Sequence, residues 1–502
     1  MKNKYLNNIL IILILFLAVS AVIIPKELNN LDELWNYNFA RNVADSLLPY
    51  RDFNMVQTPL LPLICGLVLK LTFNELIVTR ILAAILITAI LYVTYKIFEI
   101  LKINKHIVNL LIIGIFLLFY KHFCIDYNFA ILFVILITVY CELKSLSNKK
   151  EILDVNRTDF LLGILVGTSI LFKHTTGLFL SVIYIFYKLL IATNKEEFKN
   201  VFKIVLLRLL GVMIPISIFA IYLTVNNIWQ DFLDYTIYSL NTFTNKISYM
   251  NLIKGNYGFI IAILSLLVPI AIIGMYFISV CKTIKTEEQK NIFILFSYSI
   301  AAFIVVYPIS DSIHFLIGSL PALIGLAYLM WLIFKDTLKD KKLITGIKFY
   351  SKAMWVLLTV VILVYSVIVL TKYLNICTQY EKLEHFKYIP SSSEKIEKIC
   401  EYITKQDEKV YILDATAAIY MVPINRYNKD YDMLLKGNLG AKDEEGIITN
   451  LEQENNQIIV LIMNEKYRRN WQNPEKVREY IINRWTKVGE IENFDIYQKE
   501  NL

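Results

Sequence analysis

The chain has 502 residues, 56% of them hydrophobic, and a mean hydropathy of +0.52, a composition that soluble domains rarely have. Its net charge of +8 comes from basic residues that gather in alternate loops between apolar runs. The positive-inside rule explains such loops by membrane topology, which argues against nucleic acid as a partner. Because about 20 apolar residues cross a bilayer and many such runs occur, the sequence indicates a multi-pass membrane protein that is mainly α-helical.

About eleven membrane-spanning helices are predicted from the apolar runs. The first run is long and has no small-residue cleavage site after it, so we expect it to remain as a helix rather than to be removed as a signal peptide. With the basic loops in the cytoplasm, the N-terminus lies inside and, after an odd number of spans, the C-terminus lies outside. The expected spans are 5–24, 75–100, 107–121, 128–143, 159–173, 177–192, 204–225, 257–281, 292–308, 313–334 and 353–371.

The first outer loop, 25–74, is predicted to contain two helices next to the membrane. Asn30 and Glu33 have the spacing of a helix-capping box, and an apolar residue recurs every fourth position after them, so a helix over 31–48 is expected. The apolar stretch 58–73 is short and flanked by prolines. If it crossed the membrane, every later basic loop would change sides, so we expect it to lie along the outer surface.

The last segment, 372–502, becomes charged and is predicted to form a separate extracytoplasmic domain after a transmembrane domain at 1–371. Short apolar strands at 410–413 and 458–463 alternate with helical segments, which is typical of a small α/β domain. No glycine-rich phosphate loop follows the first of these strands, so a nucleotide site is not expected.

Two adjacent carboxylates, Asp32 and Glu33, follow the first span closely and lie in the first turn of the predicted helix. Acidic residues are common there because the positive end of the helix dipole favours them, so helix stabilisation is one explanation. Their position at the membrane surface favours a second one, since Arg41, Arg51 and Gln57 follow closely and would complete a polar site. The residues alone do not decide between helix stabilisation and a polar site.

Further polar residues interrupt apolar segments on the predicted outer side. Asp126 lies at the start of a predicted span, where an ionisable side chain is costly and usually has a functional role. Lys173 and His174 lie in a short turn between two spans, and His314 lies in a later turn. Each also has an ordinary explanation, because charged side chains often reach toward lipid headgroups and a histidine is often simply packed or solvated.

Several of these segments resemble the GT-C glycosyltransferases, in particular the branch of the protein O-mannosyltransferases and the aminoarabinose transferase. The stretch "LDELWNYNFARNVADSLLPYRDFN", with "QTPLLP" soon after it, is similar to the first outer loop of that branch, which carries an acidic pair and surface helices. The resemblance implies a GT-C-type bundle with juxtamembrane helices in this loop, and it does not extend to the C-terminal domain. Similar segments follow in order within 1–335: "NELIVTRILAAIL" with Arg80, "KHFCIDYNFAILF" with Asp126, "LFKHTTGLFL" with Lys173 and "YPISDSIHFLIGSLP" with His314.

The resemblance implies an enzyme that transfers a hexosyl or pentosyl group from a polyprenyl- or dolichyl-phosphate-linked sugar to a glycan, lipid or protein acceptor. The reaction would take place on the outer face of the cell membrane, where no nucleotide sugar is available. Asp32 would be the general base that deprotonates the acceptor hydroxyl, with inversion at the anomeric carbon, and Glu33 is the second candidate. Asp126 would bind hydroxyl groups of the sugar or of the acceptor.

The resemblance also implies side chains that hold the donor phosphate. A cationic side chain would pair with the phosphate, and Arg41 has the alternative of pairing with Asp45, four residues further along the helix. The candidates for the phosphate and the rest of the substrate are Arg41, Arg51, Gln57, Lys173, His174 and His314.

A divalent metal ion is left open by the sequence. Some relatives place a glutamate or histidine just before the "PL" segment, where this chain has Gln57, and a neutral amide is a poor metal ligand. Asp32, Asp126 and either His174 or His314 could still hold an ion together.

A transporter or flippase of a lipid-linked saccharide is the alternative to an enzyme. Transporters usually contain repeats and helices that glycine or proline interrupts near the membrane midplane. Here the predicted spans are mostly uninterrupted and the polar residues gather on one side, which favours chemistry at the surface. The frequent use of lysine, asparagine and isoleucine hints at a bacterial source.

Overall fold

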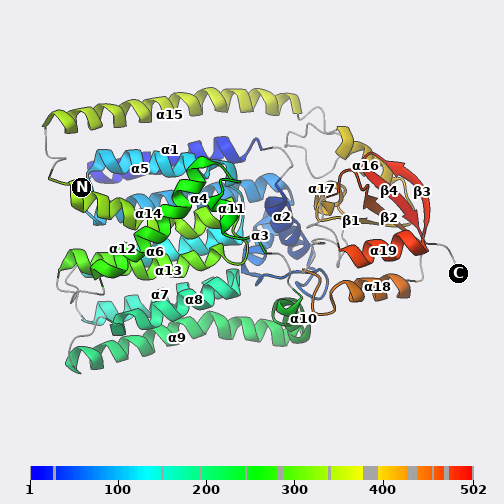
Figure 1. Cartoon of the computed structure of the whole chain (residues 1–502), viewed down its shortest axis with the longest axis horizontal. Helices are drawn as coiled ribbons and strands as arrows, with labels where there is room; N and C mark the ends of the chain where they lie inside the picture. Colours follow the sequence, from blue (N-terminus) through cyan, green and yellow to red (C-terminus); the bar gives the residue numbers. More distant parts are fainter. Residues whose placement is uncertain are drawn as a thin grey trace. The chain divides into compact units, whose positions relative to one another are not determined.

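The computed structural model contains a bundle of long helices and, near the C-terminus, a small domain with a four-stranded sheet (Figure 1). Each predicted span coincides with one helix, so the predicted fold class is confirmed. These helices are α1 (Lys2–Ile23), α4 (Leu76–Ile100), α5 (Lys105–Phe119), α6 (Tyr127–Ser147), α7 (Ile152–Phe172), α8 (His174–Phe186), α9 (Lys195–Val225), α12 (Phe259–Ser279), α13 (Glu287–Phe303), α14 (Ser312–Phe334) and α15 (Lys341–Ile376). The structure describes residues 2–26, 30–147, 152–190, 195–242, 246–279, 286–336, 341–376, 394–426, 434, 438–454, 457–468 and 474–499.

Within these described ranges, nine helices are long and apolar enough to cross a membrane, and α8 with the 3-10 helix η2 (Tyr187–Leu190) is a shorter apolar helix. Helices suit this environment because they satisfy their backbone hydrogen bonds internally, where lipid offers none. Large apolar side chains such as Ile270 on α12 and Val361 on α15 are exposed, which suits contact with lipid. The chain is therefore a multi-pass membrane protein, as its sequence predicts.

Contacts divide the chain into two compact units, and the first contains most of the membrane-spanning helices. It consists of Met1–Ile23, Ala83–Ala220 and Lys246–Val367. Helix α13 is central in this unit, because it packs against α6, α8, α12 and α14. Its side chains Leu295 and Tyr298 are fully buried, as expected for a helix with neighbours on several sides.

Small residues bring α7 and α9 of the first unit into close contact. On α7, Gly163 and Gly167 have the four-residue spacing that puts both on one face of a helix. A Cβ atom added at Gly167 would lie 2.5 Å from the carbonyl oxygen of Val212, and one at Gly211 would lie 2.4 Å from that of Phe160. Such close approach stabilises helix pairs in membranes, where helices gain little from excluding lipid and must rely on packing.

We therefore expect Gly167→Ala to destabilise the protein by about 1–3 kcal/mol, because the added methyl group forces α7 and α9 apart. Gly274→Ala is the matched control, since an added Cβ on that face of α12 meets nothing within 4 Å. Alanine at position 274 should be neutral or stabilising by up to about 1 kcal/mol through its higher helix propensity. Thermal unfolding of both variants in one detergent measures the difference, and equal unfolding temperatures would contradict the tight α7–α9 contact.

The second unit consists of Ile24–Leu82, Ile221–Asn245 and Ile368–Leu502. Its first part forms helices α2 (Leu31–Ala44) and α3 (Leu60–Leu71), which pack against each other. The contact is close because α3 presents Gly66, where an added Cβ would lie 2.7 Å from the carbonyl oxygen of Ala40. Both helices of the first loop thus begin within two residues of where the sequence predicts them.

Helix α2 is shorter than the predicted helix over 31–48. The chain leaves the helix at Asp45, because Ser46 takes the left-handed conformation with φ of 69° and the amide of Leu47 donates to the carbonyl of Asn42 at 2.9 Å. Helix α3 has 12 residues, too few to cross a membrane, and its side chain Leu67 is 58% exposed. An exposed apolar face on a short helix suits a membrane surface.

The C-terminal domain contains strands β1 (Lys409–Leu413), β2 (Ile458–Met463), β3 (Thr486–Ile491) and β4 (Phe494–Gln498), in the sheet order β1-β2-β4-β3. Strands β1 and β2 pair in parallel, whereas β4 pairs antiparallel with both β2 and β3. The sequence predicts β1 and β2, which are continuous apolar runs. Strand β3 is mostly exposed and offers no such run, so the hairpin of β3 and β4 was missed.

Helices cover both faces of this sheet and create a core on each. They are α16 (Glu394–Thr404), α17 (Ala417–Met421), α18 (Asp443–Gln453) and α19 (Glu475–Arg484). Successive strand residues point to opposite faces. Ile412 therefore packs in the cluster with α16 and α17, whereas Leu413 packs in the cluster with α18 and α19. This arrangement confirms a small α/β domain at the C-terminus.

Candidate active site

The first turn of α2 carries the two neighbouring carboxylates. Asn30 caps the helix, since its side-chain oxygen accepts a hydrogen bond of 3.3 Å from the amide of Glu33. The carboxylate of Glu33 forms a two-fold ion pair with Arg80, in which Nε–Oε1 and Nη2–Oε2 are both 2.9 Å. Both side chains are fully buried. The charge of Glu33 is therefore balanced by Arg80, and the ion pair holds the first turn of α2 in place.

Arg80 also binds the chain that leads into α2. Its Nη1 donates to the carbonyl oxygens of Ile24 at 2.8 Å and of Lys26 at 2.6 Å. One guanidinium thus connects the start of α4, the segment after α1 and the first turn of α2. In the sequence, Arg80 stands out only as part of a segment that resembles the GT-C enzymes, and a partner 47 residues away leaves no local pattern.

Asp32 has a different environment from that of Glu33. It is half-buried, whereas Glu33 is fully buried. Its backbone carbonyl accepts a hydrogen bond of 2.8 Å from the side chain of Asn36, which strengthens the first turn of the helix. Of the two adjacent acids, Asp32 is thus the less buried residue.

The other predicted residues of the first loop differ in accessibility. Arg41 is 1% exposed and donates hydrogen bonds to the C-terminal domain. Arg51 is exposed and pairs with Asp52 at 3.1 Å. Gln57 is half-buried, and its backbone carbonyl accepts a hydrogen bond of 2.8 Å from the hydroxyl of Tyr50. Arg51 is therefore the better placed of the two arginines for contact with a ligand.

A second group of predicted residues lies in the first unit, where α6 and α8 begin. Asp126 is 2% exposed, and its Oδ1 accepts a hydrogen bond of 2.7 Å from the amide of Asn128. The amide oxygen of Asn128 accepts a hydrogen bond of 3.0 Å from Nζ of Lys173, the N-cap residue of α8. The ammonium group of Lys173 also lies 5.4 Å from the ring centre of Tyr127. Asn128 therefore links the carboxylate to the ammonium group.

His314 belongs to this second group and is paired with Asp311. Asp311 caps α14, because its Oδ1 accepts a hydrogen bond of 2.9 Å from the amide of His314 and lies 2.8 Å from Nδ1 of the same residue. The beginnings of α6, α8 and α14 thus each carry a charged residue. A helix N-terminus has a partial positive charge, which favours anions.

The titration behaviour of these groups reflects burial and mutual attraction. Burial raises the pKa of Asp126, although the hydrogen bond from Asn128 and the charges of His314 and Lys173 oppose the rise. Burial lowers the pKa of Lys173 to about 8, against the opposing charges of Asp126 and Asp311. Because the charges of Lys173 and His314 act on Asp126, and those of Asp126 and Asp311 act on Lys173, these four residues form one electrostatic cluster.

His174 is the predicted residue with the most unusual surroundings. Both of its ring nitrogens are buried, and neither has a hydrogen-bond partner among the described residues. Buried polar atoms normally have partners, so an unpartnered imidazole beside Lys173 is a candidate for contact with a ligand. No group of three or more histidine, cysteine or acidic residues in the described part of the chain is arranged to hold a metal ion.

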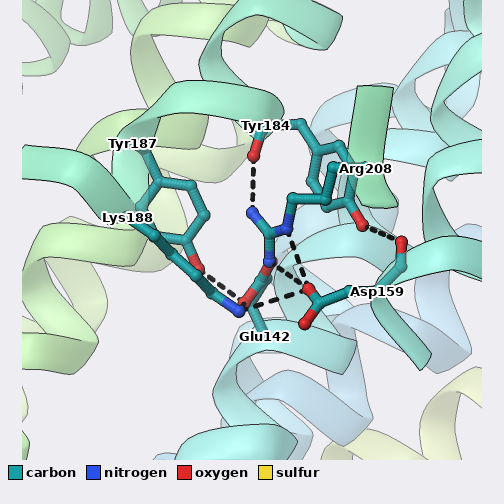
Figure 2. A network of polar contacts seen from close by, with 6 residues as sticks. All are labelled: Glu142, Asp159, Tyr184, Tyr187, Lys188 and Arg208. Atoms are coloured by element: carbon teal, nitrogen blue, oxygen red, sulfur yellow. Dashed lines mark hydrogen bonds and ion pairs between the residues drawn. The ribbon is translucent and has the colours of Figure 1, made fainter. Parts of the chain in front are cut away.

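A further buried network in the first unit, not predicted from the sequence, is formed by charged residues of α6, α7, η2 and α9 (Figure 2). Nε of Arg208 on α9 donates to Oδ1 of Asp159 on α7 at 2.8 Å, and Nη2 pairs with Glu142 on α6. Lys188 in η2 approaches both acids, at 3.2 Å from Asp159 and 3.4 Å from Glu142. The guanidinium of Arg208 also lies 4.1 Å from the ring centre of Tyr184.

Two acids and two cations balance the charge of this network, so it ties α6, α7, α8 and α9 together without a net buried charge. A signal for it was present in the sequence, because Arg208 interrupts a predicted span and a charge inside a span needs a partner. Its side chains hold one another, and we therefore assign it to the stability of the bundle.

We expect Arg208→Leu to destabilise the protein by about 3–5 kcal/mol, because it leaves two buried carboxylates with one cation. Lys188→Met should destabilise the protein less, since the Lys188 side chain is 20% exposed and Arg208 would still pair with both acids. Thermal unfolding in detergent compares the two variants. A larger loss for Lys188→Met than for Arg208→Leu would contradict the central position of the guanidinium.

No family model matches the sequence, and no curated protein matches it. ArnT from Cupriavidus metallidurans, in a crystal structure with bound undecaprenyl phosphate, matches at a TM-score of 0.58 and 10% identity, over 100% of this chain and 98% of that one. The archaeal oligosaccharyltransferase AglB from Archaeoglobus fulgidus, in complex with an inhibitory peptide and a dolichol-phosphate, matches at a TM-score of 0.50 and 12% identity, over 91% of this chain and 70% of that one.

Proposed function

The chain has the GT-C glycosyltransferase fold, and from this premise we propose that it transfers a glycosyl group from a polyprenyl-phosphate-linked sugar to an acceptor on the outer face of a membrane. The observation that carries the proposal is the cluster of Asp126, Lys173, Asp311 and His314 in a membrane-spanning bundle of this fold. Buried ionisable groups are costly in a membrane protein and usually serve a ligand or a reaction. The ArnT and AglB structures, which contain polyprenyl-type phosphates, support a donor of this class.

Lys173 is the proposed ligand of the donor phosphate. Its ammonium group is a compact charge that pairs well with a phosphate oxygen, and it lies at the N-terminus of α8, where the helix dipole adds to the attraction. The unpartnered ring of His174 would supply a hydrogen bond to the same anion. Asp126, whose Oδ1 is already bonded to Asn128, would accept hydrogen bonds from sugar hydroxyls through its remaining oxygen lone pairs.

Asp32 is the proposed general base. Its carboxylate would accept the proton of the acceptor hydroxyl while the hydroxyl oxygen forms a bond to the anomeric carbon. The bond from that carbon to the phosphate oxygen breaks, and polyprenyl phosphate leaves with the electron pair, so the configuration inverts. Glu33 is less suited to this role, because its two oxygens bind Arg80 in a fully buried pair.

The neutral amide Asp32→Asn should reduce transfer about 10²–10⁴-fold, because it cannot take the proton, and it should lower the unfolding temperature less than Glu33→Gln does. Glu33→Gln is the matched variant. It should destabilise the protein by about 3–5 kcal/mol, since Arg80 then remains buried without its counter-charge. Release of polyprenyl phosphate from a lipid-linked sugar and thermal unfolding are measured for both variants. Unchanged transfer by Asp32→Asn would reject Asp32 as the base, whereas a parent protein that releases no polyprenyl phosphate would favour a transporter.

The lowered pKa of Lys173, about 8, predicts how binding depends on pH. The side chain is charged below that pH and neutral above it, so the affinity for undecaprenyl phosphate should fall by up to about tenfold per pH unit above pH 8. Lys173→Arg keeps its charge at every accessible pH and should bind with little pH dependence over the same range. Binding titrations between pH 7 and pH 10 test this, and an equal fall for both proteins would rule out Lys173 as the titrating group.

A further inference from the structure

We infer that Arg41 is a positioning residue for the proposed base: it ties helix α2 to the C-terminal domain and so fixes the first turn that carries Asp32. The inference rests on the proposed function for the role of Asp32, and on the hydrogen bonds of Arg41 for the tie itself. All segments involved belong to the second unit.

Arg41 reaches the C-terminal domain with both terminal nitrogens of its guanidinium. Nη1 donates to the carbonyl oxygen of Val422 at 2.9 Å and to Oδ1 of Asn425 at 3.3 Å, and Nη2 donates to the carbonyl oxygen of Arg426 at 2.7 Å. Nε donates to Oδ1 of Asn38 on α2 itself at 2.9 Å. The side chain is 1% exposed, so these hydrogen bonds are made away from water, where they are strong.

The acceptors of Arg41 form a rigid turn. Helix α17 continues into the 3-10 helix η6 (Val422–Ile424), which ends at Asn425 in the left-handed conformation with φ of 54°. The amide of Arg426 then returns to the carbonyl of Met421 at 3.0 Å. The carbonyl groups at a helix C-terminus carry partial negative charge, which suits a guanidinium. Met421 packs in the sheet core, so the turn cannot shift without disturbing that core.

A second contact joins the C-terminal domain to another loop segment of the unit. Gly440 adopts φ of +80°, and a Cβ there would lie 2.9 Å from Oδ2 of Asp234 in α10 (Trp229–Thr236). The hydroxyl of Thr242 donates to the carbonyl oxygen of Gly440 at 3.2 Å. Leu439, the preceding residue, belongs to the other core cluster of the domain. The C-terminal domain is thus fixed at two places, to α2 through Arg41 and to the segment 234–242 through Gly440.

Helix α2 is consequently held at two points. Arg80 holds the first turn through Glu33, and Arg41 holds the helix eight residues further along, a rise of about 12 Å at 1.5 Å per residue. A helix fixed at one end can still tilt about that point, whereas a second fixed point removes the tilt. Asp32 adjoins the first point, so its position depends on both. The C-terminal domain therefore takes part in the geometry of the proposed reaction without supplying a catalytic residue.

Arg41→Gln in the full chain tests the inference, with Asn425→Gly as a milder variant that removes one acceptor and tolerates the left-handed turn. Arg484→Gln is the control, because Arg484 is a 68% exposed arginine of the same domain. Hydrogen exchange is read at the amides of 33–36 and at those of 422 and 424–426. Turnover and the Kd for undecaprenyl phosphate are read separately.

For Arg41→Gln we expect exchange at both sets of amides to become at least about tenfold faster, while the strands of the sheet stay protected. Turnover should fall about 100-fold, as a misplacement of roughly 1 Å would cause, with the Kd for undecaprenyl phosphate within about twofold of the parent value. The exchange rates and the turnover of Asn425→Gly should lie between those of Arg41→Gln and those of the control. This separation of turnover from binding is what a merely structural role would not produce.

Unchanged exchange at 33–36 would overturn the inference, because α2 would then not depend on Arg41. Turnover equal to that of the Arg484→Gln control, despite faster exchange, would overturn it as well. If the parent protein transfers no sugar, the proposed function fails by itself, and the exchange at 33–36 still decides whether Arg41 fixes the first turn of α2.

Discussion

The buried ion pair between Glu33 and Arg80 is the interaction on which the proposed site depends. Both oxygens of the carboxylate are engaged at 2.9 Å, and neither side chain is exposed. A carboxylate desolvated to this degree is stable only with its counter-charge in place. The pair therefore specifies one position for the first turn of α2, relative to the chain before it and to the start of α4. Asp32 adjoins the pair, so its direction and exposure follow from this arrangement.

Three buried arginines have the same function in different parts of the molecule. Arg41, Arg80 and Arg208 are each at most 1% exposed, and each joins segments that are distant in sequence. The planar guanidinium suits this purpose because it offers several donors in fixed directions and does not lose its charge on burial. Apolar packing alone would leave such helices free to slide, since lipid competes equally for apolar surfaces. The arginines supply the specific geometry that apolar contacts do not.

The sequence predicts the fold well and the site only in part. Length and hydropathy place the long helices, because crossing a membrane imposes one structure on an apolar run. The capping residue Asn30 and the acidic first turn place the beginning of α2 correctly. The end of α2 was predicted too late, because Ser46 adopts a left-handed conformation that serine seldom signals. Strand β3 was missed because it is mostly exposed, and its stability comes from pairing with β4 rather than from its own residues.

The partners of the charged residues could not be predicted, for a physical reason. An ion pair across 47 residues, or a hydrogen bond across 381, depends on how whole elements pack and leaves no local pattern. Arg41 illustrates this, because the family resemblance makes it a candidate phosphate ligand, whereas the structure buries it against the carbonyls of a distant turn. The two acids of α2 make the same point. They are neighbours in sequence and share one helix dipole, yet one is sealed in an ion pair and the other retains exposure. Packing, rather than residue type, therefore decides which of two neighbouring carboxylates is fully buried and which is not.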